Sequence, residues 1–191
     1  MSAVPAPKYI SVEDYLLKEE EAEVKHEYYQ GEMFAMAGGT ISHNRICSNV
    51  IGELHAFLKE KDCEIFPSDQ RIHCPANSFF TYPDASIVCD EIERLEKRND
   101  TITNPVVIIE VLSKRTKNYD RGDKFKLYRS IPTLKEYILI SSLEVSVERY
   151  TKQANDFWYF RESASAEDNL EIETIGFSCL IKTLYHNVTF A

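Results

Sequence analysis

Three side chains in this 191-residue sequence have the types and the spacing that metal-assisted hydrolysis requires: Asp84, Glu110 and Lys124. Glu110 interrupts the apolar run PVVIIEVL, which begins at Pro105. A carboxylate in such a run is costly to desolvate unless a cation, a hydrogen-bond donor or a metal meets it. The simpler alternative is that Glu110 marks the exit of a strand to solvent, or pairs with one of the nearby lysines.

Asp84 follows Pro83 in a second apolar run, YPDASIVCD, so the two acids can meet if the two runs form adjacent strands. Two carboxylates at neighbouring strand ends can hold Mg²⁺, a hard cation that takes oxygen ligands and leaves positions for water and a phosphate. A nearby lysine can orient or activate the attacking water and offset charge on phosphorus. Lys124 is the candidate, although Asp120 four residues before it also predicts an ordinary salt bridge.

The elements that must position these side chains follow from hydrophobic periodicity. The run 105–112 predicts a strand buried on both faces, of the kind found inside a parallel or mixed sheet. A helix is expected over Tyr119–Ser130, and its spacing puts Asp120, Lys124 and Tyr128 on one stripe.

The other periodic segments predict an α/β layered domain in which helices cover a mixed sheet. In chain order we expect a short helix after Ser11, a hairpin turning at Gln30-Gly31, a helix over 41–59, strands over 64–73 and 78–90, a charged connector over 91–99, strands over 135–140, 143–151, 156–161 and 170–175, and a short C-terminal helix.

The composition indicates a soluble, intracellular protein that forms one domain over 1–191, with a core over about 24–141 and a C-terminal strand extension over 142–191. Hydrophobic residues make up 43% of the chain, enough for a sizeable core, and no apolar run reaches bilayer-spanning length. The five cysteines are widely spaced without a CxxC pair, so we expect reduced thiols that mostly pack in the interior.

The net charge of −9 argues against non-specific binding of polyanions by the whole surface. The charge is uneven, because the stretch from Ser113 to Arg129 holds seven basic side chains and only two acidic ones. This stretch adjoins Glu110 and can grip a phosphate backbone, although a charge run is often only a solvated helix face.

Taken together, these segments resemble the PD-(D/E)XK nuclease superfamily and, within it, a large bacterial family of restriction-endonuclease-like proteins that is abundant in cyanobacteria. The matching elements cover most of the chain: the hairpin EYYQGEMFAMA, His43 at the start of the long helix, YPDASIVCD, NPVVIIEVLSKRTKNYDRGDKFKLYRSIP and LKEYILI. The resemblance implies a restriction-endonuclease-like α/β (α+β) fold, with a central mixed sheet flanked by helices, an N-terminal hairpin and additional C-terminal antiparallel strands.

The resemblance assigns the metal-binding acids to Asp84 and Glu110, with the backbone carbonyl of Val111 as a further ligand. The lysine of the superfamily's ExK tripeptide is missing, because Leu112 stands in its place. In the resembled family this lysine has moved to the following helix, which selects Lys124.

Lys114 is the competing lysine, since strand alternation would keep it on the face of Glu110, but we expect the backbone to turn away after Ser113. Glu32 is the preferred candidate for an additional acid that reaches a second metal or a water, and Glu27 is nearly as good by position.

Several further side chains are candidates for supporting roles. His43 is expected to contact phosphate or metal, with a structural role as the alternative. Ser113 and Tyr128 are expected to support the site by hydrogen bonding, or else to cap or pack. The expected nucleic-acid contacts are Lys114, Arg115, Lys117 and Arg121.

We therefore expect a Mg²⁺-dependent nuclease, with Mn²⁺ as a substitute metal, that hydrolyses phosphodiester bonds of nucleic acid, DNA being the expected substrate. Cleavage of both strands requires two active sites, so a homodimer is expected, with the strands after Leu143 as its surface. The expected location is the cytoplasm of a bacterium, on the resemblance a cyanobacterium, with no membrane partner. Two alternatives stay open: a catalytically degenerate member that binds or regulates without cleavage, which Leu112 and the acidic net charge favour, and a hydrolase of small phosphoesters.

Overall fold

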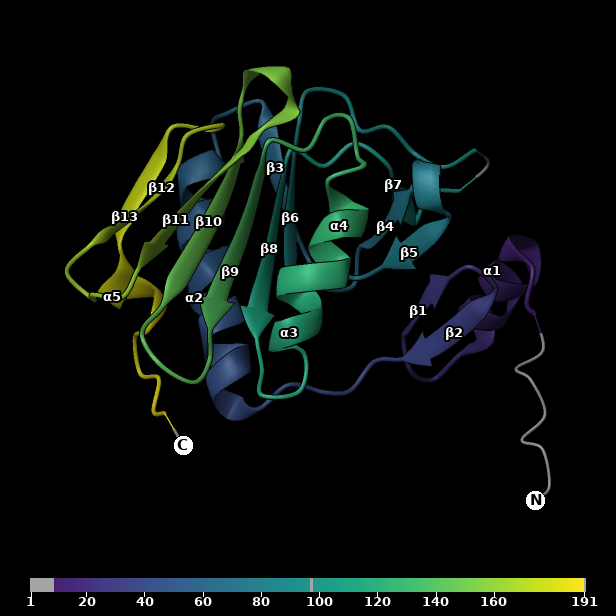
Figure 1. The fold of residues 1–191 in the computed structure, drawn as a ribbon, viewed down its shortest axis with the longest axis horizontal. Helices are drawn as coiled ribbons and strands as arrows, with labels where there is room; N and C mark the ends of the chain where they lie inside the picture. The colour runs from purple at the N-terminus through teal and green to yellow at the C-terminus, as the bar shows by residue number, and fades with distance from the viewer. Residues whose placement is uncertain (1–8, 97, 191) are drawn as a thin grey trace.

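Six strands form the central sheet of the computed structural model, which describes residues 9–96 and 98–190 (Figure 1). In chain order they are β3 (Cys63–Pro67), β6 (Ala85–Cys89), β8 (Val107–Leu112), β9 (Glu136–Ser141), β10 (Val147–Lys152) and β11 (Trp158–Ser163). Their order across the sheet is β11-β10-β9-β8-β6-β3. The β8–β9 pair is parallel and the other neighbouring pairs are antiparallel, so the sheet is mixed as predicted.

Strand β8 lies in the middle of this sheet, and all six of its residues are buried. Its alternate side chains face two different clusters of the core. Val107, Ile109 and Val111 face one cluster, and Ile108 and Leu112 face the other. The strand is therefore buried on both faces, as its continuous apolar run predicted.

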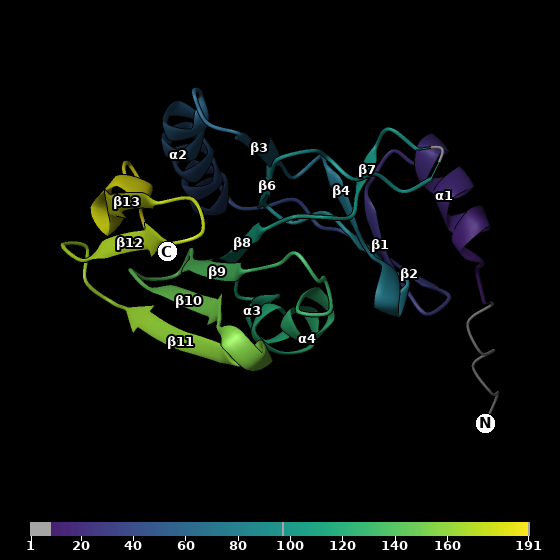
Figure 2. The ribbon, with the colours of Figure 1, turned by 90° about the horizontal axis from the view of Figure 1, so that it is seen from above.

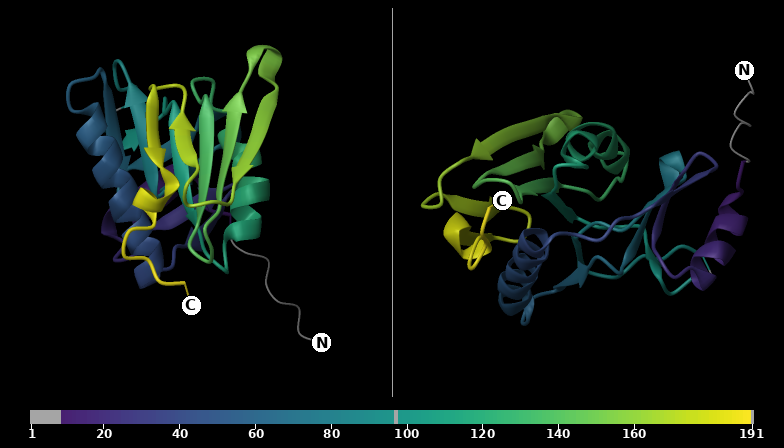
Figure 3. Two further views of the ribbon diagram at one scale, coloured as in Figure 1. Left: turned by 90° about the vertical axis from the view of Figure 1, so that its left-hand side faces the viewer. Right: turned by 90° about the horizontal axis from the view of Figure 1, so that it is seen from below.

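A helix covers each face of the central sheet, as Figure 2 and the left view of Figure 3 show. On one face lies α2 (Ile41–Leu58), whose first turn is capped by the Thr40 side chain accepting from the backbone N–H of His43. On the other face lies the helical segment 117–128. It consists of α3 (Lys117–Tyr119), the π-helical stretch η2 (Asp120–Lys124) and α4 (Phe125–Tyr128).

A second, five-stranded sheet lies beside the helical segment, on the right in Figure 1. Its order is β2-β1-β5-β4-β7, with bounds β1 (His26–Tyr29), β2 (Glu32–Ala35), β4 (Arg71–Cys74), β5 (Phe79–Thr81) and β7 (Thr101–Ile102). The helix α1 (Val12–Glu21) packs on it through Tyr15, which stacks on Tyr28. Phe79 of β5 in turn meets the ring of Tyr128 edge to face. The helical segment is thus held between two sheets.

The C-terminal residues extend the first core cluster. A third sheet of two strands, β12 (Asn169–Ile172) and β13 (Phe177–Leu180), leads into α5 (Ile181–Leu184). Ile181 and Leu184 pack in the same cluster as α2. The predicted fold class is confirmed: a mixed sheet flanked by helices, with an N-terminal hairpin and additional C-terminal antiparallel strands. Among the residues that the structure describes, no helix is long and apolar enough to cross a bilayer.

Two predicted strands are each divided in the structure. The segment 64–73 forms β3 and β4, and the segment 78–90 forms β5 and β6, with the short 3-10 helix η1 (Pro75–Asn77) between β4 and β5. Each division carries the chain from one sheet to the other, at a turn after Pro67 and at Pro83. A proline lacks the N–H that would continue the ladder of hydrogen bonds, which explains both positions.

The other predicted element boundaries differ less from the observed ones. The helical segment begins at Lys117 and not at Tyr119, and β7 and β13 were not predicted. The connector 91–99 contains no helix in its described part, 91–96 and 98–99. Strand β7 has only two residues, too few to show a period, and β13 lies in the tail where only a short helix was expected.

The prediction that all five cysteines are reduced is wrong for two of them. Cys63 and Cys89 occupy paired positions on the neighbouring strands β3 and β6 and form a disulfide. Cys47, Cys74 and Cys179 are free. The two bonded residues are 26 positions apart, so their pairing depends on the register of two strands and not on local spacing.

The disulfide should stabilise the fold by restricting the unfolded chain. Closing a loop of 26 residues removes enough entropy from the unfolded state to contribute about 3.5 kcal/mol. We expect reduction, or the double substitution Cys63→Ser/Cys89→Ser, to lower the free energy of unfolding by that amount in urea titrations.

The matched control is Cys179→Ser, which removes a free, half-buried thiol and should cost much less. Thiol titration of the unfolded, unreduced protein should find three thiols. Five titratable thiols, or a stability unchanged by reductant, would show that the bond does not form in solution.

Candidate active site

The pairing of β6 with β8 sets the two candidate acids opposite each other. Ala85 pairs with Ile109 in this antiparallel ladder, so the next position places Asp84 opposite Glu110. Oδ2 of Asp84 accepts a hydrogen bond of 2.7 Å from the backbone N–H of Val111. This bond anchors the carboxylate of Asp84 to the strand that carries Glu110.

Lys124 brings a positive charge to the acids from the helical segment. Its Nζ lies 2.8 Å from Oε1 of Glu110, 3.0 Å from Oε1 of Glu27 and 3.9 Å from Oδ1 of Asp120. All four side chains are buried, Lys124 with 4% of its surface exposed. The salt bridge to Asp120 that spacing alone predicts is therefore the longest of the three contacts. Lys124 ends the π-helical stretch η2, a local form that occurs frequently at functional sites.

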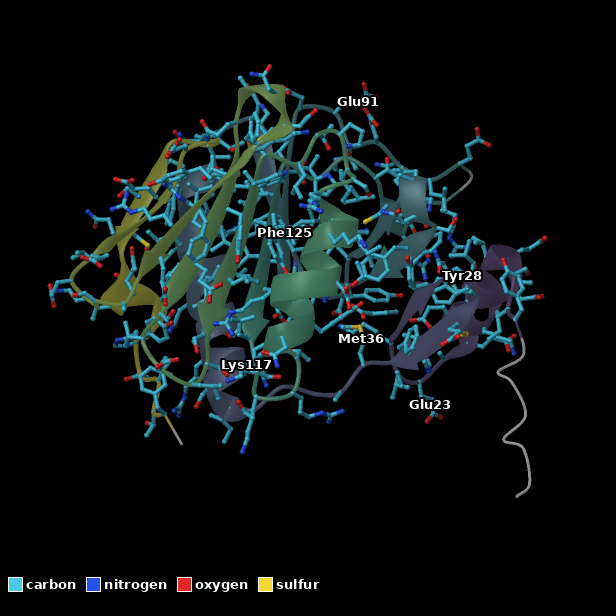
Figure 4. All side chains as sticks on the ribbon, viewed as in Figure 1. Glu23, Tyr28, Met36, Glu91, Lys117 and Phe125 are labelled. Carbon is cyan, nitrogen blue, oxygen red and sulfur yellow. A yellow bond between two sulfur atoms is a disulfide. The ribbon has the colours of Figure 1, made fainter. Side chains whose placement is uncertain are left out.

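Hydrogen bonds fix the two glutamates that Lys124 contacts. The hydroxyl of Tyr128 donates to Oε1 of Glu110 over 2.7 Å. Thr81 Oγ1 donates to Oε1 of Glu27, and the hydroxyl of Tyr119 reaches Oε2 of Glu27. In Figure 4, Lys117 and Phe125 mark the helical segment and Tyr28 marks β1, the two elements that the contact of Lys124 with Glu27 joins.

The burial of this cluster shifts the pKa values of its members. Burial raises the pKa of Glu110 to about 8; Lys124 opposes this shift, and the charges of Asp84 and Asp120 add to it. Burial works against the charged form of Lys124, but the carboxylates of Glu110, Glu27 and Asp120 outweigh it and hold the Lys124 pKa well above its usual range. Lys124 is therefore an ammonium at neutral pH and acts as a donor and a positive charge, not as a base.

A histidine and a cysteine of α2 meet the other side of the acid pair. Nε2 of His43 lies 3.2 Å from Oδ2 of Asp84, and Nδ1 of His43 lies 3.6 Å from Sγ of Cys47. Burial raises the pKa of Asp84, but the hydrogen bond and charge of His43 and the N–H of Val111 outweigh it and lower the pKa overall. Asp84 is consequently the ionised acid of the site.

The donor set of the two acids fits a hard divalent cation. The contacts of Glu110 with Lys124 and Tyr128 both use Oε1, and the contacts of Asp84 with Val111 and His43 both use Oδ2. Each acid thus has a second oxygen that these contacts leave available. Carboxylate oxygens are the ligands that Mg²⁺ and Mn²⁺ prefer.

The two candidates for an additional acid, Glu27 and Glu32, differ in burial. Glu27 is buried against Lys124, whereas Glu32 is exposed on β2, paired in register with Tyr29. Sequence reasoning ranked Glu32 first. Both acids lie near the same turn, and the spacing does not show which of them faces the helical segment.

The candidate phosphate contacts lie on and after the loop that follows β8. Lys114 and Arg115 are exposed, and Lys117 is half-buried. Ser113 accepts hydrogen bonds from the backbone N–H groups of Arg115 and Thr116, so it caps this turn. Arg121 instead forms an ion pair with Glu148, at 2.8 Å from Nε, which offsets its charge.

Thr81, Tyr119 and Cys47 complete the site, and sequence reasoning missed all three. Cys47 had a usable signal, because it follows His43 by four residues on the same helix. Thr81 and Tyr119 had none, since they reach Glu27 only through the packing of the five-stranded sheet on the helical segment.

Comparison with known proteins relates the whole chain to one family. A family model described as Uma2, putative restriction endonuclease, matches residues 12–182. Among similar proteins is the uncharacterized protein slr1290 of Synechocystis sp., 38% identical over 188 residues, covering 98% of this chain and 97% of that protein. The uncharacterized protein sll1609 of the same organism is 35% identical over 173 residues, covering 91% of this chain and 97% of that protein.

A solved structure shares the fold. It is the crystal structure of a putative nuclease belonging to DUF820 from Anabaena variabilis, which superposes with a TM-score of 0.77 at 19% sequence identity. The alignment covers 94% of this chain and 99% of the other. This likeness extends to the C-terminal strands as well as to the central sheet.

Removal of the Lys124 charge should destabilise the fold most at alkaline pH. Lys124→Met leaves Glu110 and Glu27 buried without their cation, a change that typically costs about 3 kcal/mol. The pKa of Glu110 is already raised, so the folded state binds the proton more tightly than the unfolded chain, and stability falls as pH rises from about 4.5 to about 8. Loss of the ammonium raises this pKa further, so the stability of the variant goes on falling above about pH 8, where that of the wild type levels off, and its deficit should grow there.

Urea titrations of the wild type and Lys124→Met at several pH values measure this deficit. Lys126→Met, an exposed lysine of α4, is the matched control and should stay within about 0.5 kcal/mol of the wild type. A deficit of Lys124→Met that does not change between about pH 7 and about pH 9.5 would contradict the charge-based explanation.

Proposed function

The chain belongs to the Uma2 family of putative restriction endonucleases, as its sequence resemblance predicted, and from this premise we propose that it is a metal-dependent nuclease. The expected reaction is hydrolysis of phosphodiester bonds, with DNA as the substrate and Mg²⁺ as the metal, for which Mn²⁺ can substitute. One observation carries the proposal: two acids at paired strand ends share their site with the buried ammonium of Lys124, 2.8 Å from Glu110.

Asp84, Glu110 and the backbone carbonyl of Val111 are the proposed metal ligands. The bound ion would supply a Lewis acid that polarises the phosphate and lowers the pKa of a coordinated water. Asp84 suits this role because it is ionised and anchored by the N–H of Val111. Glu110 suits it because Tyr128 and Lys124 hold one oxygen and leave the other available.

Lys124 is proposed to position the attacking water and to offset negative charge on the phosphate. Its raised pKa supports this role, since a permanently protonated amine donates hydrogen bonds throughout the reaction. Glu27 and Asp120 hold the ammonium in place, so Glu27 is proposed as a positioning residue for Lys124. Glu32, exposed on β2, is the proposed contact for a second metal.

The nucleic acid is proposed to approach along the loop after β8. Lys114, Arg115 and Lys117 would contact backbone phosphates, which position a substrate without specifying its sequence. Arg121 is a poorer candidate, because Glu148 neutralises it. His43 is proposed to contact the phosphate or the metal through its position beside Asp84.

A homodimer in the cytoplasm is the proposed assembly and location. Cleavage of both strands of a duplex needs two active sites. A surface for the second copy is supported by the exposed aromatic side chains at the edge strand β11 and its preceding turn, Phe157, Tyr159 and Phe160. We propose that the chain forms one domain, in which the six-stranded and five-stranded sheets together frame a single site.

A catalytically degenerate protein is the second candidate function. One observation favours it: Leu112, in the position where the superfamily has its lysine, is buried in the core and offers no charge. The contact of Lys124 with Glu110 favours the active enzyme, because it provides an ammonium at the same acid. A cleavage assay separates the two candidates.

We expect the wild type to cut mixed linear and supercoiled DNA in the presence of Mg²⁺ or Mn²⁺ and not in EDTA. Asp84→Asn, Glu110→Gln and Lys124→Met should each lower the rate by about 100-fold or more, since each removes a metal ligand or the transition-state cation. Rates from gel densitometry are compared at equal folded concentration, checked by circular dichroism.

Lys114→Ala is the matched control, because Lys114 is exposed and competes with Lys124 for the catalytic role. Its loss should weaken binding modestly and leave the metal-dependent step in place. If Lys114→Ala alone abolished cutting, Lys114 and not Lys124 would be the catalytic lysine. A wild type that binds metal without cutting DNA would support the catalytically degenerate protein.

A further inference from the structure

Asp84 of the acid pair also belongs to a second cluster of metal-ligating side chains, with a histidine and a cysteine of α2. The proposed nuclease reaction does not use these three side chains as a set. The cluster offers three ligand atoms, one each from His43, Cys47 and Asp84, and these atoms lie within 4.8 Å of one another. All three side chains are partly buried. They come from two elements, α2 and the chain entering β6.

Local structure explains why the cluster forms. His43 and Cys47 are four residues apart on α2, so both point from the same face of the helix. Two ligands at this spacing on one helix face are a recurrent way to bind zinc. Asp84 completes the set from the sheet, where the N–H of Val111 holds its carboxylate.

The chain also leaves room for the imidazole. A Cβ at Gly39 would lie 2.5 Å from Nδ1 of His43, closer than real contacts allow. A glycine at this position therefore permits the histidine ring to sit over the start of the helix. Any larger residue would displace the ring from Cys47 and Asp84.

The chemistry of this donor set differs from that of the acid pair. A thiolate and an imidazole favour Zn²⁺ and Co²⁺, whereas Mg²⁺ takes oxygen ligands. Three protein ligands with one open position describe the usual coordination of a non-structural zinc. Burial raises the pKa of the Cys47 thiol, with the charge of Asp84 adding to the shift, so without a metal this thiol stays protonated and unreactive.

We propose that His43, Cys47 and Asp84 form a binding site for a zinc-like transition metal, and that occupation of this site inhibits the nuclease. Inhibition follows because Asp84 belongs to both donor sets. Metal binding would release the thiol proton of Cys47 to solvent, and an ion held by the imidazole and the thiolate would draw the Asp84 carboxylate away from the position in which it holds Mg²⁺. The binding step stands by itself, and the inhibition rests on the proposed nuclease function.

Cobalt spectroscopy tests the binding step without any activity. The purified full chain, without reductant so that the Cys63–Cys89 disulfide persists, is titrated with Co²⁺ and followed by ultraviolet and visible absorption. We expect a thiolate-to-cobalt charge-transfer band that saturates at one equivalent and disappears when Zn²⁺ is added. Excess Mg²⁺ should produce no such band.

Variants assign the band to the cluster. Cys47→Ser should abolish it, and His43→Ala should weaken Co²⁺ affinity by at least about tenfold. Cys179→Ser, which removes a free thiol of β13, is the matched control and should keep the band. No band in the wild type, or a band that persists in Cys47→Ser, would overturn the site.

The inhibition step is tested by measuring, for each variant, the Zn²⁺ concentration at which Mg²⁺-dependent cleavage falls to half of that variant's rate without Zn²⁺. Cys47→Ser should need at least about tenfold more Zn²⁺ than the wild type. An equal Zn²⁺ requirement in both would overturn the inhibition while leaving the spectroscopic site intact. If the wild type does not cleave at all, the nuclease function and its inhibition both fail, and the cobalt band alone decides whether the site exists.

Discussion

The buried ammonium of Lys124 links the two large sheets of the fold. Its two short contacts join Glu110, from the six-stranded sheet, to Glu27, from the five-stranded sheet. Burying an ammonium and two glutamates is expensive, and their mutual contacts, with the carboxylate of Asp120 and the hydroxyls of Tyr128, Thr81 and Tyr119, offset the cost. The helical segment 117–128 is consequently held between the two sheets by charge as well as by apolar packing.

This arrangement explains how a site can work with Leu112 where the superfamily has a lysine. A lysine at that position would extend from the strand, whereas Lys124 reaches the same acid from a helix that packs over the strand. Leu112 is then free to join the apolar core. What the proposed chemistry requires is an ammonium beside Glu110, and the fold can provide it from either element.

The parts that could be predicted from the sequence are those that depend on local pattern. A carboxylate within the apolar run around Glu110 had to be compensated, and the stripe containing Lys124 followed from helical spacing. The choice between Glu27 and Glu32 could not be predicted, because it depends on which side of the hairpin packs against the helical segment. Two further features could not be predicted either: the division of two strands between the sheets, and the disulfide that joins β3 to β6. Each depends on which strands pair, and periodicity does not specify pairing partners.

The most direct test of the central claim is to locate the metal. Crystals grown with Mn²⁺, with diffraction measured where manganese scatters anomalously, would show the ion and its ligands. We expect an anomalous peak within about 2.5 Å of a carboxylate oxygen of both Asp84 and Glu110, with Nζ of Lys124 still beside Glu110. A peak whose ligands exclude either acid, or no peak at saturating Mn²⁺, would contradict it.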